Sequence, residues 1–530
     1  MATLATAPGQ PIPLHPEEQM DFKKWVAVFG AILGAFMAIL DIQITNASIR
    51  EVTGGLGATI EDGSWISTSY LVAEIIIIPL SGWLARVLSL RTYLIWTSVL
   101  FLFFSVCCGL AWNLESMIIF RALQGLTGGA LIPLAFQVIL SIPPSKRAIG
   151  MALFSITATF APAIGPTVGG YLTESFHWPV IFFMNLIPGA LLLGTVTYAI
   201  DAEPKRFDLL QAIDRWGILT MAIGLSSLTI FLEEGERKDW FGSHMIVWLF
   251  LSAVVFITAF IWIELKIPNP FINLRLLLRR NFGLGSLANF VVGMAMYGAL
   301  YLLPLYLSTI QGYNSVYIGK TMMWAGLPQL MILPFLPKIM ARVDTRWMAF
   351  VGLNIFAFSC YMNSQMTADV GIEQLRWSQF VRAMGQPLLM VPLSTITTGL
   401  IEREQAGSAS GLFNMLRNLG GSVGIAVLST LFTMREQFHS AKLGEGVTVY
   451  SQAVQDRLLN LTMFFTQKGY DPKSALQKAI GAVDFAVRKQ ASVMAFNDCF
   501  YFVSIALVLS SFLILLCKEV KAGKGASDAH

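Results

Sequence analysis

The sequence predicts an all-α membrane protein, and three features of the chain support this fold class. Of the 530 residues, 55% are hydrophobic and 13% are charged, whereas soluble proteins carry about 25% charged residues. Stretches of about twenty mostly apolar residues, the length that a helix needs to cross a bilayer, recur along the chain. Basic residues gather in alternate connections between these stretches, as expected when a chain crosses a membrane repeatedly.

The apolar stretches predict about fourteen transmembrane helices. They lie at residues 24–49, 65–85, 92–111, 114–140, 148–171, 180–200, 216–232, 244–264, 282–308, 317–340, 347–365, 374–399, 407–433 and 494–517. The predicted domains are a cytoplasmic N-terminal tail (1–21), an N-terminal six-helix bundle (22–201), a linker with two extra transmembrane helices (202–280), a C-terminal six-helix bundle (281–517) and a cytoplasmic tail (518–530).

The distribution of Lys and Arg predicts the orientation of the chain. With the N-terminus inside, about twenty basic residues fall in the inward connections and tails, and about five fall in the short outward loops. This excess places both termini in the cytoplasm. Residues 434–493 then form a long periplasmic loop, and a loop of this length is largely exempt from the rule.

A weak internal repeat suggests two related halves. The pair Arg121-Ala122 followed by Pro133-Leu134 recurs as Arg382-Ala383 followed by Pro392-Leu393. Two parallel six-helix repeats around a site at the midplane of the membrane would leave such a signal. Chance similarity between apolar segments is the alternative.

Five ionisable residues lie deep in predicted spans: Asp41, Glu74, Arg121, Arg382 and Arg417. Because a charge inside a bilayer is expensive, each is a candidate functional residue. Asp41, Glu74 and Arg121 lie at a similar depth, about 10–14 Å below the outer surface. Either carboxylate would neutralise Arg121 in a structural ion pair. The second acid would then lack a full partner and could carry a proton.

The segment 154–171 is an apolar helix that carries Gly165, Pro166, Gly169 and Gly170. The spacing of Gly165 and Gly169 lets two helix backbones touch, and neighbouring helices can satisfy the backbone group that Pro166 frees. The segment therefore predicts a tight, bent helix crossing. Ordinary close packing with no special role is the alternative.

The order of several short motifs resembles drug-exporting members of the major facilitator superfamily. The run from Gly165 to Gly170 resembles the antiporter signature of their fifth helix. The whole set resembles the EmrB/QacA branch, the drug:proton antiporters with two extra helices, and is closest to its EmrB-type exporters. The other motifs are Leu40-Asp41 with Asn46, Gly82 to Ala85, Phe120 to Gly125, His177-Trp178 with Phe182-Phe183 and Asn185, Arg382-Ala383, Pro392-Leu393 and Ala406 to Leu416.

The resemblance implies a major facilitator fold, with two six-helix bundles and two inserted helices, in a bacterial inner membrane. It implies proton-coupled export of hydrophobic toxic compounds, with the proton gradient in place of any cofactor. A periplasmic adaptor like EmrA and an outer-membrane channel like TolC are the implied partners. Asp41 matches the acidic position of the first-helix motif, and Arg121 matches an arginine that the family links to proton transfer. Glu74 matches no motif, so it would tune the cavity for cationic drugs or simply form a pair.

Polar residues in the predicted spans are expected to line a wet central cavity. By the resemblance, Arg382 and Arg417 face this cavity, where they would attract anionic or weakly acidic compounds; hydrogen bonding between helices is their alternative role. The expected lining residues are Gln43, Gln124, Gln137, Arg382, Gln386, Asn414, Arg417 and Asn418.

One motif departs from the family pattern. The loop after the second helix of facilitators usually reads Gly-x-Leu-Ala-Asp-Arg-x-Gly-Arg-Arg, whereas this chain has Arg86 at the Asp position and Ser89 at the second Gly. The usual ion pair of that loop is therefore not carried over. Gly82 and Arg91 remain comparable as parts of a conformational motif.

The periplasmic loop 434–493 predicts an amphipathic hairpin. Asp471 is suited to cap a helix that begins at Pro472. Apolar residues follow at helical spacing on two helices: Val454, Leu458, Leu461 and Phe465 on the first, and Leu476, Ile480, Val483 and Val487 on the second. The hairpin would lie on the membrane or contact a partner, the adaptor first; alternatively it only covers its own bundle.

Other classes of function find little support in the sequence. The net charge of +4 is scattered, so a nucleic-acid partner is not expected. The Cys and His residues lack metal-ligand spacing, and no Walker loop, HExxH or GxSxG motif occurs. A membrane-bound enzyme or receptor would need a soluble catalytic domain or clustered His and carboxylates, so a transporter is expected rather than an enzyme. A proton-coupled exporter of one specific metabolite or siderophore is the closer alternative.

Overall fold

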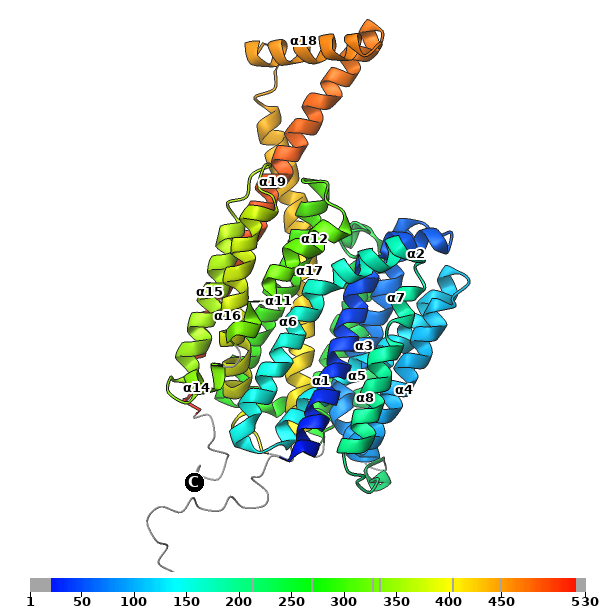
Figure 1. The fold of residues 1–530 in the computed structure, drawn as a ribbon, viewed down its shortest axis with the longest axis vertical. Coiled ribbons are helices and arrows are strands. Elements are labelled where there is room, and N and C mark those ends of the chain that lie inside the picture. Colours follow the sequence, from blue (N-terminus) through cyan, green and yellow to red (C-terminus); the bar gives the residue numbers. More distant parts are fainter. Residues whose placement is uncertain are drawn as a thin grey trace, which may run out of the picture.

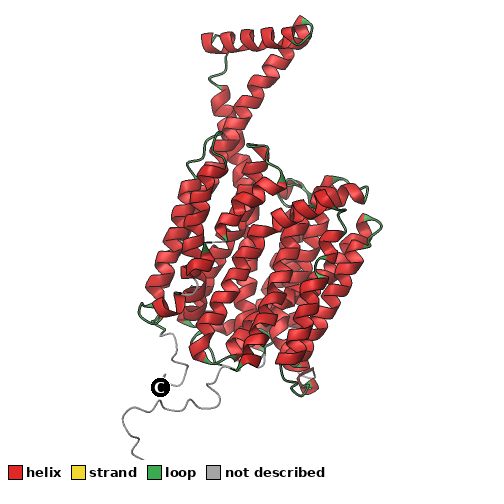
Figure 2. Cartoon of the chain, viewed as in Figure 1, coloured by secondary structure: helices red, strands yellow, loops and turns green. Residues whose placement is uncertain are grey.

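The computed structural model describes residues 21–210, 214–267, 270–326, 328–332, 335–402, 405–448 and 450–520. Within these ranges the chain forms helices and no strands (Figure 1, Figure 2). Residues 1–20 and 521–530, which make up most of the two predicted tails, lie outside the described residues. The all-α prediction is confirmed for the part of the chain that is described.

The N-terminal half is a helical bundle whose helices begin at recognisable caps. The Asp21 side chain accepts a hydrogen bond from the Phe22 N–H at the start of the first helix, and Asn113 and Ser116 form a capping box at another. The helices are α1 (Phe22–Ala47), α2 (Ile49–Gly55), α3 (Ile60–Leu88), α4 (Leu90–Gly109), α5 (Leu114–Ser141), α6 (Pro144–Ser175), α7 (Val180–Phe183) and α8 (Leu186–Ala199).

The C-terminal half is a second bundle beside the first (Figure 1). Its own apolar core includes Leu353, Phe356, Phe496 and Phe500. Its helices are α11 (Arg280–Thr309), α12 (Ser315–Met322), α13 (Gln329–Ile332), α14 (Leu336–Met340), α15 (Thr345–Asn363), α16 (Ile372–Thr398), α17 (Ala406–Gly444), α18 (Gln452–Gln467) and α19 (Pro472–Leu515).

Two inserted helices, α9 (Arg215–Glu234) and α10 (His244–Lys266), connect the halves in sequence. α9 packs against α10, but also against α3 of the N-terminal half and α17 of the C-terminal half. Met221 and Leu225 of α9 share an apolar cluster with Ile78 of α3 and Leu412 of α17. The apolar surface of α10 is mostly exposed, as expected for a helix that faces lipid. The inserted pair therefore joins the bundle along one side through α9.

Ten helices in the described residues are long and apolar enough to cross a membrane. The other four predicted spans fall on α6, on α12 to α14, on α15 and on α16. Of these, α6 packs against α1, and α15 packs against α16 and α19, so they lie inside the bundles. The count of fourteen spans stays a prediction, with which this architecture is consistent.

The predicted span 317–340 is wrong as a single helix. In the described residues it divides into α12, a 3-10 turn at Met323–Ala325, α13 and α14. Gly326 and Pro328 lie in the first break. Glycine weakens a helix, and proline lacks the N–H donor that a continuous helix needs at that position.

Two helices of the C-terminal half continue far beyond the bundle. α17 has 39 residues and α19 has 44, which correspond to lengths of about 58 and 66 Å, whereas the hydrocarbon core of a bilayer is about 30 Å thick. Their outer ends carry α18, which lies crosswise at the far end of the molecule (Figure 1). The predicted periplasmic hairpin is thus α18 with the beginning of α19, set on extensions of two membrane helices.

The predicted cap of this hairpin is confirmed. Pro472 is the first residue of α19, and the Asp471 side chain accepts a hydrogen bond from the Ser474 N–H at 3.1 Å. The apolar residues of the predicted stripe on α18 are all half-buried: Val454, Leu458, Leu461 and Phe465.

At the beginning of α19, the predicted apolar stripe faces outward rather than toward α18. Ala475 and Ala479 are buried, whereas Leu476 and Ile480 are 45% and 52% exposed. Small side chains let α18 pack closely on α19, so the larger apolar side chains point outward.

The two halves touch at both ends of their interface. We call the end near the described chain ends the terminal face, and the opposite end the α18 face. At the terminal face, a Cβ on Gly82 of α3 would lie 2.5 Å from the carbonyl oxygen of Gly407 of α17. At the α18 face, Gly319 of α12 lies against the Thr167 side chain of α6. Backbone contact this close requires glycine, so both ends are closed in this arrangement.

Candidate functional site

A buried ion pair joins α1 and α5 in the N-terminal half. Arg121 Nη1 donates a hydrogen bond to Asp41 Oδ2 at 2.6 Å, and both side chains are 1% exposed. The other carboxylate oxygen, Oδ1, accepts hydrogen bonds from Asn185 at 2.6 Å and from Gln124 at 3.1 Å. Both oxygens of Asp41 are therefore hydrogen-bonded, and Arg121 balances its negative charge.

The Arg121 guanidinium is held from several sides. It lies 4.4 Å from the centre of the Tyr70 ring, donates to Gln124 Oε1 at 2.7 Å and donates to the Ile66 carbonyl at 3.4 Å. These contacts anchor α5 to α3 and fix the position of the charge. Of the two carboxylates that the sequence offered to Arg121, Asp41 is the one that pairs with it.

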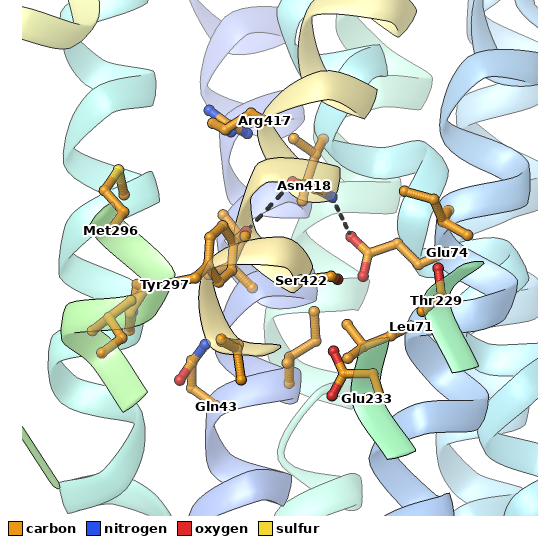
Figure 3. A pocket seen from close by; sticks show the side chains of 18 residues that line it. Gln43, Leu71, Glu74, Thr229, Glu233, Met296, Tyr297, Arg417, Asn418 and Ser422 are labelled. Carbon is orange, nitrogen blue, oxygen red and sulfur yellow. Dashed lines mark hydrogen bonds between the residues drawn. The ribbon is translucent and has the colours of Figure 1, made fainter. Parts of the chain in front are cut away.

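A cavity lies between the two halves (Figure 3). Helices α1, α3, α5, α6, α9, α11 and α17 supply its walls. Apolar side chains such as Leu71, Met296 and Leu300 line much of it, and charged or polar groups interrupt them. This mixture of apolar walls with a few polar and charged groups is typical of a small-molecule site.

Glu74 of α3 lines this cavity (Figure 3), whereas Arg121 pairs with Asp41. Its Oε1 accepts a hydrogen bond from the Asn418 amide at 3.3 Å, and the Tyr297 hydroxyl donates to Asn418 Oδ1 at 3.5 Å. Among the described residues, no basic side chain forms an ion pair with Glu74. The acid without a full charge partner is thus Glu74 in this arrangement.

Within the described residues, the C-terminal half contributes one cation to the cavity. Arg417 of α17 is buried, lines the cavity, and donates a hydrogen bond to Asn414 at 3.0 Å. Gly293 of α11 lies directly against the Arg417 backbone, which fixes α17 beside α11. Of the predicted cavity residues, Gln43, Arg417 and Asn418 line it.

The other five predicted cavity residues lie outside its lining. Gln124 belongs to the ion-pair network, and Asn414 donates to the Ser410 carbonyl at 2.9 Å. Gln386 accepts a hydrogen bond from Gln329 at 2.8 Å. The Nε2 atom of Gln137 is buried with no partner among the described residues.

Arg382, the fifth of these residues, is buried in the C-terminal half. Its guanidinium lies 5.2 Å from the centre of the Phe356 ring, and its Nε has no hydrogen-bond partner among the described residues. The internal repeat aligns Arg382 with Arg121. The second half has no counterpart of Asp41, however, since no carboxylate pairs with Arg382 in the described chain.

The sequence reasoning missed one acidic residue of the cavity lining. Glu233 lies near the outer end of α9 and lines the cavity together with Thr229 of the same helix (Figure 3). The predicted span 216–232 ended one residue before it, so Glu233 was assigned to a loop. The helical spacing could have revealed Glu233, because Thr229 and Glu233 are four residues apart and so lie on one face of the helix.

The glycines of α6 bring it close to α1. A Cβ on Gly165 would lie 2.5 Å from the Gln43 Cβ, and a Cβ on Gly169 would lie 3.1 Å from the Ile44 carbonyl oxygen. Pro166 lies within the helix, and Gly170 is buried. The helices do cross closely here; a conformational role for the motif stays a prediction.

The comparable residues of the loop motif make structural contacts. Gly82 forms the closed contact with Gly407 at the terminal face, and Arg91 Nη2 donates to the Thr197 carbonyl of α8 at 2.8 Å.

Two helical halves around a central cavity that is partly charged have the form of a secondary membrane transporter. The sequence pattern of the Major Facilitator Superfamily matches residues 31–425. This protein belongs to that superfamily, in its EmrB-type branch.

The relatives match almost the whole chain. The colistin resistance protein EmrB of Acinetobacter baumannii is 33% identical over 511 residues, which cover 96% of this chain and 99% of the relative. The multidrug export protein EmrB of Escherichia coli (strain K12) is 33% identical over 505 residues, covering 94% and 96%. The crystal structure of the human organic anion transporter MFSD10 shares the fold, with a TM-score of 0.59 over 93% of this chain and 99% of that chain, at 14% identity.

Proposed function

We propose that this protein exports hydrophobic toxic compounds of varied structure across a bacterial inner membrane, driven by protons that move inward. The observation that carries the proposal is the cavity between the halves, which combines apolar walls with Glu74, Glu233 and Arg417. A site of this kind can hold many organic molecules without a fixed pattern of hydrogen bonds. The functions in the names of the relatives, multidrug export and colistin resistance, support export of toxic compounds.

Proton coupling is assigned to Asp41 and Arg121. In the paired arrangement, the charge of Asp41 balances a buried guanidinium at 2.6 Å. A proton on Asp41 removes that balance, and an unpaired buried charge costs several kcal/mol. This cost is enough to bias two conformations that differ by a few kcal/mol. The protonated protein therefore favours a second arrangement of α1 and α5.

The exchange cycle follows from this bias. When the cavity opens to the acidic outer side, substrate leaves and Asp41 takes up a proton. When the cavity opens to the cytoplasm, substrate binds and the return of Arg121 to Asp41 releases the proton. The arrangement with both ends closed is suited to lie between these states, since Gly82 and Gly319 both make close contacts across the interface.

The assembly is proposed to be a tripartite pump. Both termini would lie in the cytoplasm, and α18 would then stand in the periplasm. α18 offers exposed apolar side chains, Leu459, Met463 and Phe464, about 47–60% exposed, and exposed apolar residues of this kind mark contact surfaces. Its expected partner is an EmrA-like adaptor that leads to a TolC-like outer-membrane channel.

Transport by the purified protein tests the function. In proteoliposomes with an imposed pH gradient, we expect uptake or release of several unrelated hydrophobic compounds, and dissipation of the gradient should abolish it. A growth-inhibition panel with and without the gene tests the breadth of substrates. Protection against a single metabolite or siderophore would replace the multidrug proposal with a specific exporter.

A further inference from the structure

The inserted helix α9 contributes directly to the central cavity. It packs against α3 and α17, one from each half, and presents Thr229 and Glu233 to the cavity (Figure 3). A pair of helices that served only as a spacer would need no carboxylate on this face. A carboxylate in a membrane segment is expensive and indicates a function by default.

Glu233 and Glu74 face the same side of α17, one helical turn apart. Glu74 accepts its hydrogen bond from Asn418, and the Ser422 hydroxyl bonds the Glu233 carboxylate. Asn418 and Ser422 are four residues apart, so they lie on one face of α17 with a rise of about 6 Å between them. The two acids therefore lie one above the other along one wall of the cavity.

The environment of Glu233 leaves it available to a ligand. Its Oε1 is buried and has no hydrogen-bond partner among the described residues. In the described chain, no basic side chain forms an ion pair with Glu233, and Arg417, the cation that lines the cavity, bonds Asn414. A buried carboxylate oxygen without a partner is costly, so a cation that reaches it gains a strong interaction.

The neighbouring residue Glu234 shows what a structural acid looks like at this position. It is paired with Arg237 and accepts a hydrogen bond from Ser64 at 3.1 Å. Its side chain is 1% exposed and faces α3. Glu234 therefore stabilises the packing of α9 against α3, whereas Glu233 faces the cavity.

We propose that Glu233, together with Glu74, forms a recognition site for organic cations in the central cavity, supplied in part by the inserted helix. The inference rests on the proposed transport function and adds its substrate class. Tyr297, Met296 and Leu71 stand around the acids and would hold a bulky apolar or aromatic body beside the positive charge. The preferred ligand is thus a lipophilic cation.

Two probes of nearly equal shape and opposite charge test the proposal: tetraphenylphosphonium and tetraphenylborate. Binding of each to the purified full-length protein is measured at one fixed pH. For Glu233→Gln, we expect tetraphenylphosphonium to bind about tenfold more weakly, which corresponds to about 1.4 kcal/mol. Tetraphenylborate should bind equally well or more tightly, because a negative charge has been removed. Glu233→Asp should keep most of the preference for the cation.

A matched control is Glu236→Gln, which removes the same charge just beyond the end of α9. Glu236 is exposed and accepts a hydrogen bond from Thr433 at 2.9 Å, outside the cavity lining. It should leave the binding of both probes unchanged. Thermal unfolding of each variant reports whether the fold is preserved.

The possible outcomes distinguish failure of the cation site from failure of the proposed transport function. Equal weakening of both probes by Glu233→Gln, or no change for the cation, would overturn the cation site while leaving the transport function in place. Wild-type protein that binds neither probe would count against the broad cavity itself, and so against both proposals.

Discussion

The Asp41 carboxylate, which accepts hydrogen bonds from Arg121, Gln124 and Asn185, is the residue on which coupling is expected to depend. Asp41→Asn keeps the shape but leaves Arg121 without a charge partner. We expect substrate binding to persist with its pH dependence lost, and accumulation against a gradient to fall to the level of empty vesicles. The variant should also unfold more easily, by about 3–5 kcal/mol, because a buried charge is left unpaired.

Arg121→Gln combined with Asp41→Asn is the control for stability, since it removes both charges. It should recover much of the stability of the wild type, because neutral replacement of a buried pair is less costly than breaking it, while transport stays absent. Glu74→Gln should reduce proton-driven export less than Asp41→Asn does. If Asp41→Asn still exports under an imposed pH gradient and Glu74→Gln does not, the two acids exchange roles.

At the residue scale, the sequence was most informative where motif and membrane depth agreed. Asp41 and Arg121 were selected by both signals, and the structure joins them at 2.6 Å. The partner of Glu74 could not be predicted, because Asn418 lies 344 residues away on the other half. Glu233 was missed because its charge made the apolar window end before it.

At the element scale, the contact of α3 with α17 closes one end of the cavity. Gly82→Ala would place a Cβ 2.5 Å from the Gly407 carbonyl oxygen. Such overpacking costs about 1–3 kcal/mol, which changes the ratio of closed to open states by about 5- to 150-fold. We expect slower transport with little loss of overall stability, measured as initial rates in proteoliposomes. Gly194→Ala is the control, since a Cβ there meets nothing within 4 Å; equal rates for the two variants would contradict this closure.

Helix boundaries were predictable where the length of an apolar stretch determines them. They were less predictable where tertiary packing determines them. The first span was predicted at 24–49 and α1 runs from Phe22 to Ala47. Hydropathy could not show the break after α12, since apolar residues continue through it. Hydropathy also could not show that α17 and α19 extend as helices beyond the bilayer, because the polar composition of their outer parts is typical of a loop.

At the scale of the whole molecule, contacts between distant segments constrain the topology. Lys23 Nζ lies 2.5 Å from Asp201 Oδ1, and Asn281 donates to the Lys518 carbonyl at 2.9 Å. The beginning and end of each half therefore lie on the terminal face, as an even number of crossings in each half requires. The positive-inside rule predicts that this face is cytoplasmic. A reporter fused at Asp201 should report a cytoplasmic location and one at Gly446 a periplasmic location; an outside signal at Asp201 would overturn the orientation.

The α18 surface makes a separate prediction for the assembled pump. Leu459, Met463 and Phe464 are exposed on a helix in which no described side chain is fully buried, so their replacement by Ser should leave the bundle intact. If α18 contacts an adaptor, loss of this apolar area weakens the contact. We expect the triple variant to transport normally in proteoliposomes but to lose resistance in cells that contain the adaptor and the outer-membrane channel.

Asn460→Ala with Gln467→Ala is the matched control for this surface, because both residues are exposed polar positions of α18. This variant should keep resistance as well as transport, and surface expression of both variants is measured in parallel. Equal loss of transport and resistance in the triple variant would mean that α18 supports the bundle itself. Retention of both would place the adaptor contact elsewhere on the α18 face, where the exposed Leu476 and Ile480 of α19 are the next surface to change.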